Sequence, residues 1–188
     1  MKSGAHAPAT QPVVRVWSLG VRALHWSLAA TVMAAWVTRE GFGVWHERVG
    51  DVCLALVGVR LLMGFMSGTR ARFSQFVRGP GITWAYARQA WARREPRYLG
   101  HNPLGAWMIL ALLFTAAMTG VTGWVYTTDR FWGDPLVEQL HEICATALVG
   151  LAAAHVLGVI ATSIRHRENL ARAMVTGDKR CASGDDIV

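Results

Sequence analysis

Residues 141–164 of this chain read HEICATALVGLAAAHVLGVIATSI, an apolar run that carries two histidines. A helix needs about 20 predominantly apolar residues to cross a hydrocarbon core of about 30 Å, so this run is long enough to span a membrane. His141 and His155 are fourteen residues apart, which is just under four helical turns and about 21 Å along the helix axis. The spacing therefore predicts two imidazoles on nearly the same face of one membrane helix.

Working outward, three more apolar segments of similar length precede this one. Apolar types make up 53% of the 188 residues and charged types only 16%, against the usual quarter or so for a soluble domain. Lipid offers the backbone no hydrogen-bond partners, so such spans must be helical. The sequence predicts an all-α integral membrane protein, a four-transmembrane-helix bundle with spans at about 19–38, 48–67, 104–126 and 142–164.

The polar segments divide the rest of the chain. We expect a polar N-terminal tail at 1–14, a membrane domain at 15–176 and a polar C-terminal tail at 177–188. A basic loop at 68–102 is longer than a bundle connection usually requires. Within it, residues 82–91 are predicted to form an amphipathic helix on the inner membrane surface, serving either as a basic anchor for anionic lipid or as a partner site.

The distribution of positive charge predicts the orientation of the chain. Its formal net charge is +7, and fifteen of its nineteen lysines and arginines fall in the N-terminal segment, the loop 68–102 and the tail after residue 164. Cytoplasmic loops carry such an excess. Both termini are therefore expected in the cytoplasm, with the chain crossing the membrane several times and presenting an acidic outer face. Nucleic-acid binding needs a basic face on a soluble fold, and the distribution of lysines and arginines along this chain does not indicate one.

Four histidines lie in or at the ends of the predicted spans, where ionisable residues are costly and usually functional. Depth pairs His46 with His141 on the outer side and His25 with His155 on the inner side. Two bis-histidine sites stacked in a bundle core suit two haem b groups. Interhelical hydrogen bonding or a proton relay is the alternative. Cysteines do not form CxxC or CxxCH, so neither a zinc site nor covalent haem attachment is predicted.

Two further residues are candidates for the inner side. Arg60 lies fourteen residues after His46, at about the depth of His155, where a haem propionate would offer a counter-charge. Snorkelling of Arg60 to the interface is the alternative. His101, just before the predicted third span, is a candidate quinone-site residue with a pKa near neutrality, or a surface histidine without a role.

An ordered set of motifs resembles the prokaryotic cytochrome b561 family, which includes b-type cytochrome subunits of nickel-iron hydrogenases. The matching stretches are VRVWSLGVRALHW (14–26), HERVG (46–50), VRLL (59–62), RFSQFVRGP (72–80), YLGHNPLGA (98–106), LHE (140–142) and HRENLARAMVTG (166–177). They cover the chain from Val14 to Gly177. Ser18 departs from the pattern, because relatives often carry an acidic residue after the tryptophan.

The resemblance implies four transmembrane helices, two b haems, ligands at His25, His46, His141 and His155, and exchange with ubiquinone or menaquinone. The leading hypothesis is electron transfer between the quinone pool and a periplasmic partner, either a c-type cytochrome or a dehydrogenase subunit. The resemblance also leaves open a superoxide oxidase that reduces quinone, and a haem anchor subunit for a hydrogenase or another dehydrogenase. An acidic outer face favours a basic partner over superoxide.

Overall fold

The computed structural model describes residues 12–41, 43–66, 72–184 and 186–187. Most of the predicted N-terminal tail, with Lys2 and His6, and the first part of the loop 68–102 fall outside these residues. The described chain folds into seven helices and two short strands: β1 (Val13–Arg15), α1 (Leu19–Thr38), α2 (Gly43–Met66), α3 (Phe73–Phe76), α4 (Pro80–Trp91), α5 (Pro103–Tyr126), α6 (Pro135–Arg165), α7 (Leu170–Thr176) and β2 (Asp178–Arg180).

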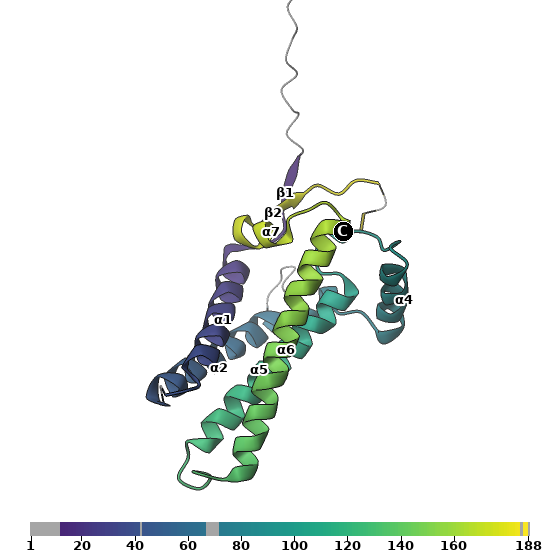
Figure 1. The fold of residues 1–188 in the computed structure, drawn as a ribbon. Coiled ribbons are helices and arrows are strands. Elements are labelled where there is room, and N and C mark those ends of the chain that lie inside the picture. Colours follow the sequence, from purple (N-terminus) through teal and green to yellow (C-terminus); the bar gives the residue numbers. More distant parts are fainter. Residues whose placement is uncertain (1–11, 42, 67–71, 185, 188) are drawn as a thin grey trace, which may run out of the picture.

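Long helices form the body of the molecule, and the strands, α7 and α4 lie toward one end of it (Figure 1). We call this end, with the start of α5 and the end of α6, the basic end, and the end formed by residues 39–41 and 127–134 the hairpin end. Helix α5 packs against both α6 and α2, and α1 packs on α2.

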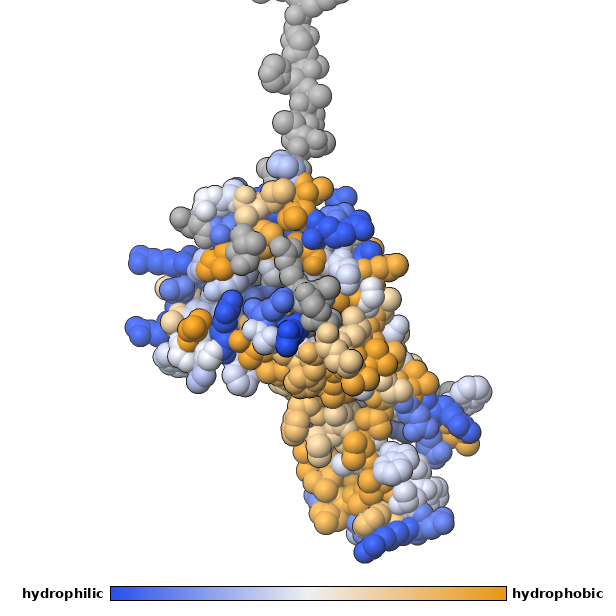
Figure 2. Space-filling model, turned by 180° about the vertical axis from the view of Figure 1, so that it is seen from behind, coloured by the Kyte–Doolittle hydropathy of each residue, from blue (hydrophilic) through white to orange (hydrophobic). Residues whose placement is uncertain are grey.

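Among the described residues, three helices are long and apolar enough to cross a membrane: α2, α5 and α6. Figure 2 shows apolar residues over the middle of the molecule and hydrophilic residues toward its two ends. Large side chains such as Phe65, Phe114 and Leu157 are about two-thirds exposed on these helices, as expected for surfaces that contact lipid rather than water. The protein is therefore embedded in a membrane. Helix α1 has 20 residues, but Arg22 and His25 lower its apolar character.

Side-chain caps define where the long helices begin. The Asn102 side chain accepts a hydrogen bond from Gly105 N at 2.7 Å, and Pro103 occupies the first helical position. Asp134 likewise accepts from Leu136 N and Val137 N at the start of α6. Helix α5 thus matches its predicted span closely, whereas α2 and α6 begin five and seven residues before theirs. His141 consequently lies almost two turns inside α6 rather than at its first turn.

The main core lies between α2, α5 and the short helix α3. Val57 and Ala106 are almost completely buried there, and Phe73 and Phe76 of α3 cover the end of the same cluster. Small residues let the two long helices approach closely, which is how membrane helices gain packing energy without a hydrophobic driving force. This core fixes α5 against α2, and α5 in turn positions α6.

A small cap joins the two ends of the described chain at the basic end. Strands β1 and β2 pair antiparallel, with Val14 opposite Lys179. The turn between α7 and β2 depends on Gly177, which has a φ of +89° and whose carbonyl accepts hydrogen bonds from Val16 N and Trp17 N. An added Cβ there would lie 2.7 Å from the Trp17 carbonyl oxygen, so only glycine fits.

A buried network of ion pairs holds the cap together. Arg97 binds Glu168 at 2.7 Å and Asp186 at 2.6 Å, while Lys179 binds Glu168 at 3.2 Å. Lys179 Nζ also donates to the carbonyls of Tyr98 and Leu99. Burial alone would raise the pKa of Glu168, but the Arg97 hydrogen bond and the nearby Lys179 charge hold that pKa below its usual value. The carboxylate is therefore ionised at neutral pH.

Replacing Glu168 with glutamine should open this cap. The change leaves Arg97 and Lys179 buried with too little negative charge, and breaking a buried pair costs about 3–5 kcal/mol. Amide hydrogen exchange of residues 178–187 measures the effect as faster local opening. Asp178→Asn is the matched control, because its ion pair with Arg15 is largely exposed and should contribute at most about 1 kcal/mol. Equal exchange in both variants would contradict the assigned role of the network.

Candidate functional site

Four histidines from three helices form two facing pairs along α6. His25 of α1 and His155 of α6 have ring centroids 6.3 Å apart, toward the basic end. His46, in the first turn of α2, and His141 of α6 have centroids 6.0 Å apart, toward the hairpin end. The structure brings together the same pairs that helix depth predicts. One helix thus supplies a member of each pair to a different partner helix.

Hydrogen bonds orient both rings of the His46–His141 pair. His46 Nδ1 donates to the carbonyl of Ala35 at 3.0 Å, and His141 Nδ1 donates to the carbonyl of Thr119 at 3.0 Å. A carbonyl only accepts, so each Nδ1 carries the proton and each Nε2 keeps a lone pair. This arrangement, with Nδ1 bonded to the backbone and Nε2 available, is the one that metal-ligating histidines adopt.

Gly123 makes room for the His141 ring. An added Cβ at Gly123 would lie 3.0 Å from His141 Cε1 and 3.3 Å from Nδ1, closer than ordinary contact. The Thr122 hydroxyl, buried in α5, also lies 3.3 Å from His141 Nδ1. Helix α5 therefore sets the position of this ring from one side, while α6 sets it from the other.

The spacing within both pairs fits a metal bound between two imidazoles. A metal–nitrogen bond of about 2 Å on each side places two ring centroids roughly 6 Å apart. Rings separated by this distance are too far apart for a direct imidazole–imidazole hydrogen bond. At Gly50 and Gly158, near His46 and His155 along their helices, an added Cβ would meet no atom within 4 Å. The donor set and the room beside it fit a b-type haem, whose macrocycle supplies the remaining ligands.

The described residues contain no group of three or more His, Cys, Asp or Glu side chains that could hold a metal ion. A zinc or transported metal ion would usually need such a cluster. A pair of imidazoles is what a haem iron requires from the protein, because the macrocycle provides the other nitrogens.

His101 lies near the inner pair, between two aromatic rings. Its ring centroid is 4.6 Å from that of Trp17 and 4.9 Å from that of Phe76. Burial, followed by the positive charges of Arg60 and Lys179, lowers the pKa of His101 to about 3. The predicted pKa near neutrality was therefore wrong: the sequence cannot show that a residue before a helix is covered by the cap. His101 is neutral at physiological pH.

Arg60 is buried in α2, at the level of α3 and His101. Its guanidinium carbon lies 5.0 Å from the centre of the Phe73 ring, and only 8% of the residue is exposed. The buried guanidinium adds positive charge to the surroundings of His101.

Several residues of this region carry no signal in the sequence. Trp17 appears in the sequence only within the motif at 14–26, yet its ring packs at a tilt beside that of His101 in the cap. The carbonyls of Ala35 and Thr119 are backbone groups and have no sequence pattern. Ser18, where relatives often have an acid, is the N-cap of α1 and accepts from Val21 N at 3.4 Å, a role that serine fills as well as aspartate.

Comparison with known proteins gives one match. Residues 16–177 match the family described as prokaryotic cytochrome b561, a range that runs from the residue after β1 to Gly177. Neither the curated proteins nor the solved structures give a match. The family implies b-type haem binding and electron transfer within a membrane, in agreement with the two histidine pairs. This chain belongs to the prokaryotic cytochrome b561 family.

Proposed function

We propose that the protein transfers electrons across the bacterial inner membrane between the quinone pool and a periplasmic redox partner. Two b haems, one at His25–His155 and one at His46–His141, would supply one-electron redox chemistry in series. The observation that carries the proposal is the pair of facing imidazole sites along α6, with centroids 6.3 and 6.0 Å apart. In this proposal α1 is the fourth membrane crossing, and the basic end faces the cytoplasm.

His25 and His155 would hold one haem and His46 and His141 the other, so that two imidazoles would bind each iron. Two histidines on each iron suit electron transfer rather than oxygen binding. The Ala35 and Thr119 carbonyls hold the outer rings in a fixed tautomer, which limits rearrangement between the oxidised and reduced states. Apolar helices around the sites exclude water, so charge near each site has a large effect on its potential.

Arg60 is assigned to the inner site as an electrostatic partner. It is buried, and its charge contributes to lowering the pKa of His101, so its field reaches this region. We place it near an inner haem propionate, where a guanidinium would form charge-assisted hydrogen bonds. A nearby positive charge favours the reduced state of the iron.

His101 is assigned to the quinone site. A neutral imidazole donates a hydrogen bond from one nitrogen and accepts with the other, so it can bind either a quinone carbonyl or a quinol hydroxyl. Trp17 and Phe76 flank it with flat apolar surfaces that suit a flat ring. Because its pKa is about 3, His101 would position the headgroup and not store a proton at neutral pH.

The hairpin end suits a basic redox partner. Its acidic residues are Glu40, Glu47, Asp51, Asp129, Asp134, Glu138 and Glu142, against Arg39, Arg48 and Arg130. An acidic surface steers a basic protein, such as a soluble c-type cytochrome, to this end. A dehydrogenase subunit that binds here would deliver electrons by the same route.

His46→Ala and His155→Ala should each abolish one low-spin haem. Each variant removes one axial ligand of a different site, so the haem content should fall by about half with one ligand pair intact. Pyridine haemochrome quantitation and reduced-minus-oxidised spectra of the purified protein measure both. His166→Ala, at the C-cap of α6, is the control. Unchanged haem content in the first two variants would overturn the proposal.

Arg60→Gln should lower the midpoint potential of the inner haem. Removing a positive charge within several ångströms shifts a potential on the order of 50 mV in a medium of intermediate dielectric constant. A redox titration followed at the haem absorption bands measures the shift. Arg48→Gln, at the hairpin end, should leave the inner potential unchanged. If both variants behave alike, Arg60 does not act on the inner site.

His101→Gln should slow electron exchange with quinol while leaving the haems intact. Glutamine keeps a donor and an acceptor but cannot hold them in the geometry of the imidazole. One hydrogen bond contributes about 0.5–1.5 kcal/mol, so the quinol-driven rate of haem reduction should fall by up to about tenfold. Reduction by dithionite and the haem spectrum should stay normal, and His166→Gln is the matched control. A normal quinol rate in His101→Gln would move the quinone site elsewhere. Superoxide-driven haem reduction in the wild type would instead favour the superoxide oxidase alternative.

A further inference from the structure

Helix α4 presents an aromatic and basic face away from the bundle. Trp84, Arg88 and Trp91 follow the spacing i, i+4, i+7, which places them on one side of the helix. The two tryptophans are 68% and 90% exposed. Tyr86 is buried on the side that packs against the bundle. Indoles this exposed would be unfavourable in water.

Contacts at both ends of α4 fix its level along the bundle. Near its start, Trp107 Nε1 of α5 donates to the Arg78 carbonyl at 3.2 Å and lies 3.1 Å from Thr83 Oγ1. Near its end, Arg165 of α6 donates to the Ala90 carbonyl at 2.9 Å. Helix α4 therefore lies beside the start of α5 and the end of α6, where apolar helix surface gives way to the polar cap (Figure 1).

The positive charge around α4 lacks acidic neighbours in the sequence. Residues 80–94 contain Arg88, Arg93 and Arg94 and no aspartate or glutamate. Glu95, the next acid, is nearly buried and is bound to Arg165 at 2.9 Å. Repulsion among these arginines is unfavourable unless an external anion lies near them.

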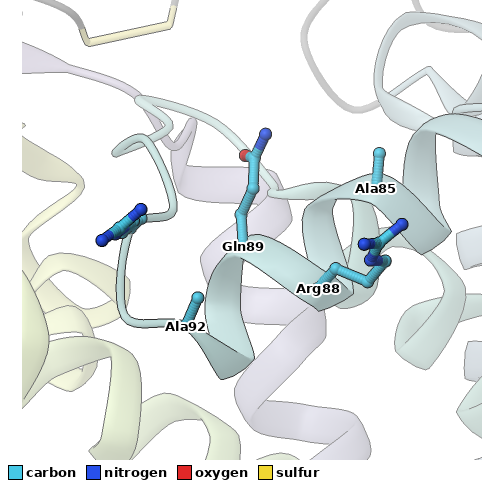
Figure 3. A pocket seen from close by; sticks show the side chains of 5 residues that line it. Ala85, Arg88, Gln89 and Ala92 are labelled. Atoms are coloured by element: carbon cyan, nitrogen blue, oxygen red, sulfur yellow. The ribbon is translucent and has the colours of Figure 1, made fainter.

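A hollow on the surface lies beside two of these arginines. It has a volume of about 370 Å³ and is lined by Ala85, Arg88, Gln89, Ala92 and Arg94. Figure 3 shows the side chains of Arg88 and Gln89 rising from α4 beside the small side chains of Ala85 and Ala92. The two guanidinium groups and the amide of Gln89 provide donors suited to phosphate oxygens.

We propose that α4 lies in the interfacial layer on the cytoplasmic side of the membrane. We propose also that this hollow binds the phosphate of an anionic phospholipid. Trp84 and Trp91 lie at the boundary between headgroups and acyl chains, where indoles are favoured. Arg88 and Arg94 bind the headgroup of a lipid such as phosphatidylglycerol. The level of α4 beside the ends of α5 and α6 and its positive charge favour an anionic lipid over a protein partner.

Lipid titration of the full-length protein tests the phosphate site. The protein in an uncharged detergent is titrated with phosphatidylglycerol or phosphatidylcholine, and bound lipid is counted by native mass spectrometry. Each arginine near an anionic headgroup contributes about fivefold in affinity, so Arg88→Gln combined with Arg94→Gln should weaken phosphatidylglycerol binding about 25-fold. Arg48→Gln with Arg130→Gln is the matched control at the hairpin end. Arg88→Lys with Arg94→Lys should restore most of the binding.

Equal affinities for the two lipids, or the same loss in the control variant, would overturn the proposal. Competition by millimolar inorganic phosphate with no preference for lipid would identify a soluble phosphate site instead. The same mass spectra report bound haem, so a failure of the haem sites is recognised separately.

Depth measurements test the indoles independently of the charges. In bilayers of phosphatidylcholine brominated near the top of the acyl chain, Trp84→Phe with Trp91→Phe should remove part of the quenchable tryptophan fluorescence. Trp17→Phe, in the covered cap, should not. An unchanged quenchable fraction in the α4 variant would place this helix in water and would also overturn the proposal, even if arginine-dependent lipid binding were found.

Discussion

A polar side chain inside a hydrocarbon core must find its partners within the protein, and the placement of four imidazoles on this bundle follows from that constraint. Helix α6 carries two of them fourteen residues apart, and α1 and α2 each bring one to meet them. The backbone carbonyls of Ala35 and Thr119 satisfy the outer rings from the far side. Helix α5 packs between α2 and α6 and so maintains the distances between the paired histidine rings.

The basic end solves a different problem, since it must keep polar groups buried close to the membrane surface. Arg97, Lys179 and Glu168 pair with one another rather than with water, and the cap that they hold covers His101. The cap also has a small apolar core of Val16, Trp17 and Leu99, but the two cations buried beside it depend on the ionised state of Glu168. The neutral state of His101 follows from the same burial.

The sequence predicts the helices where local signals are strong. Asn102-Pro103 marks the start of α5 to within a residue, and a helix within residues 82–91 is confirmed as α4. The earlier start of α6 at Pro135 could be anticipated from Asp134-Pro135 as a helix start, but not from the apolar span. Pairing of β1 with β2 joins residues more than 160 positions apart, and such non-local contacts leave no trace in local propensity. The roles of the four histidines as haem ligands and of Arg60 as a partner of a propionate stay predictions.

Gly177 has a consequence for how the protein is made. Its carbonyl receives the amides of Val16 and Trp17, and the strand before them pairs with β2, so neither contact can form until residues 177–180 have left the ribosome. The segment before α1 must wait, unpaired, while every membrane helix is inserted. Closure of the cap is thus a terminal step of biogenesis.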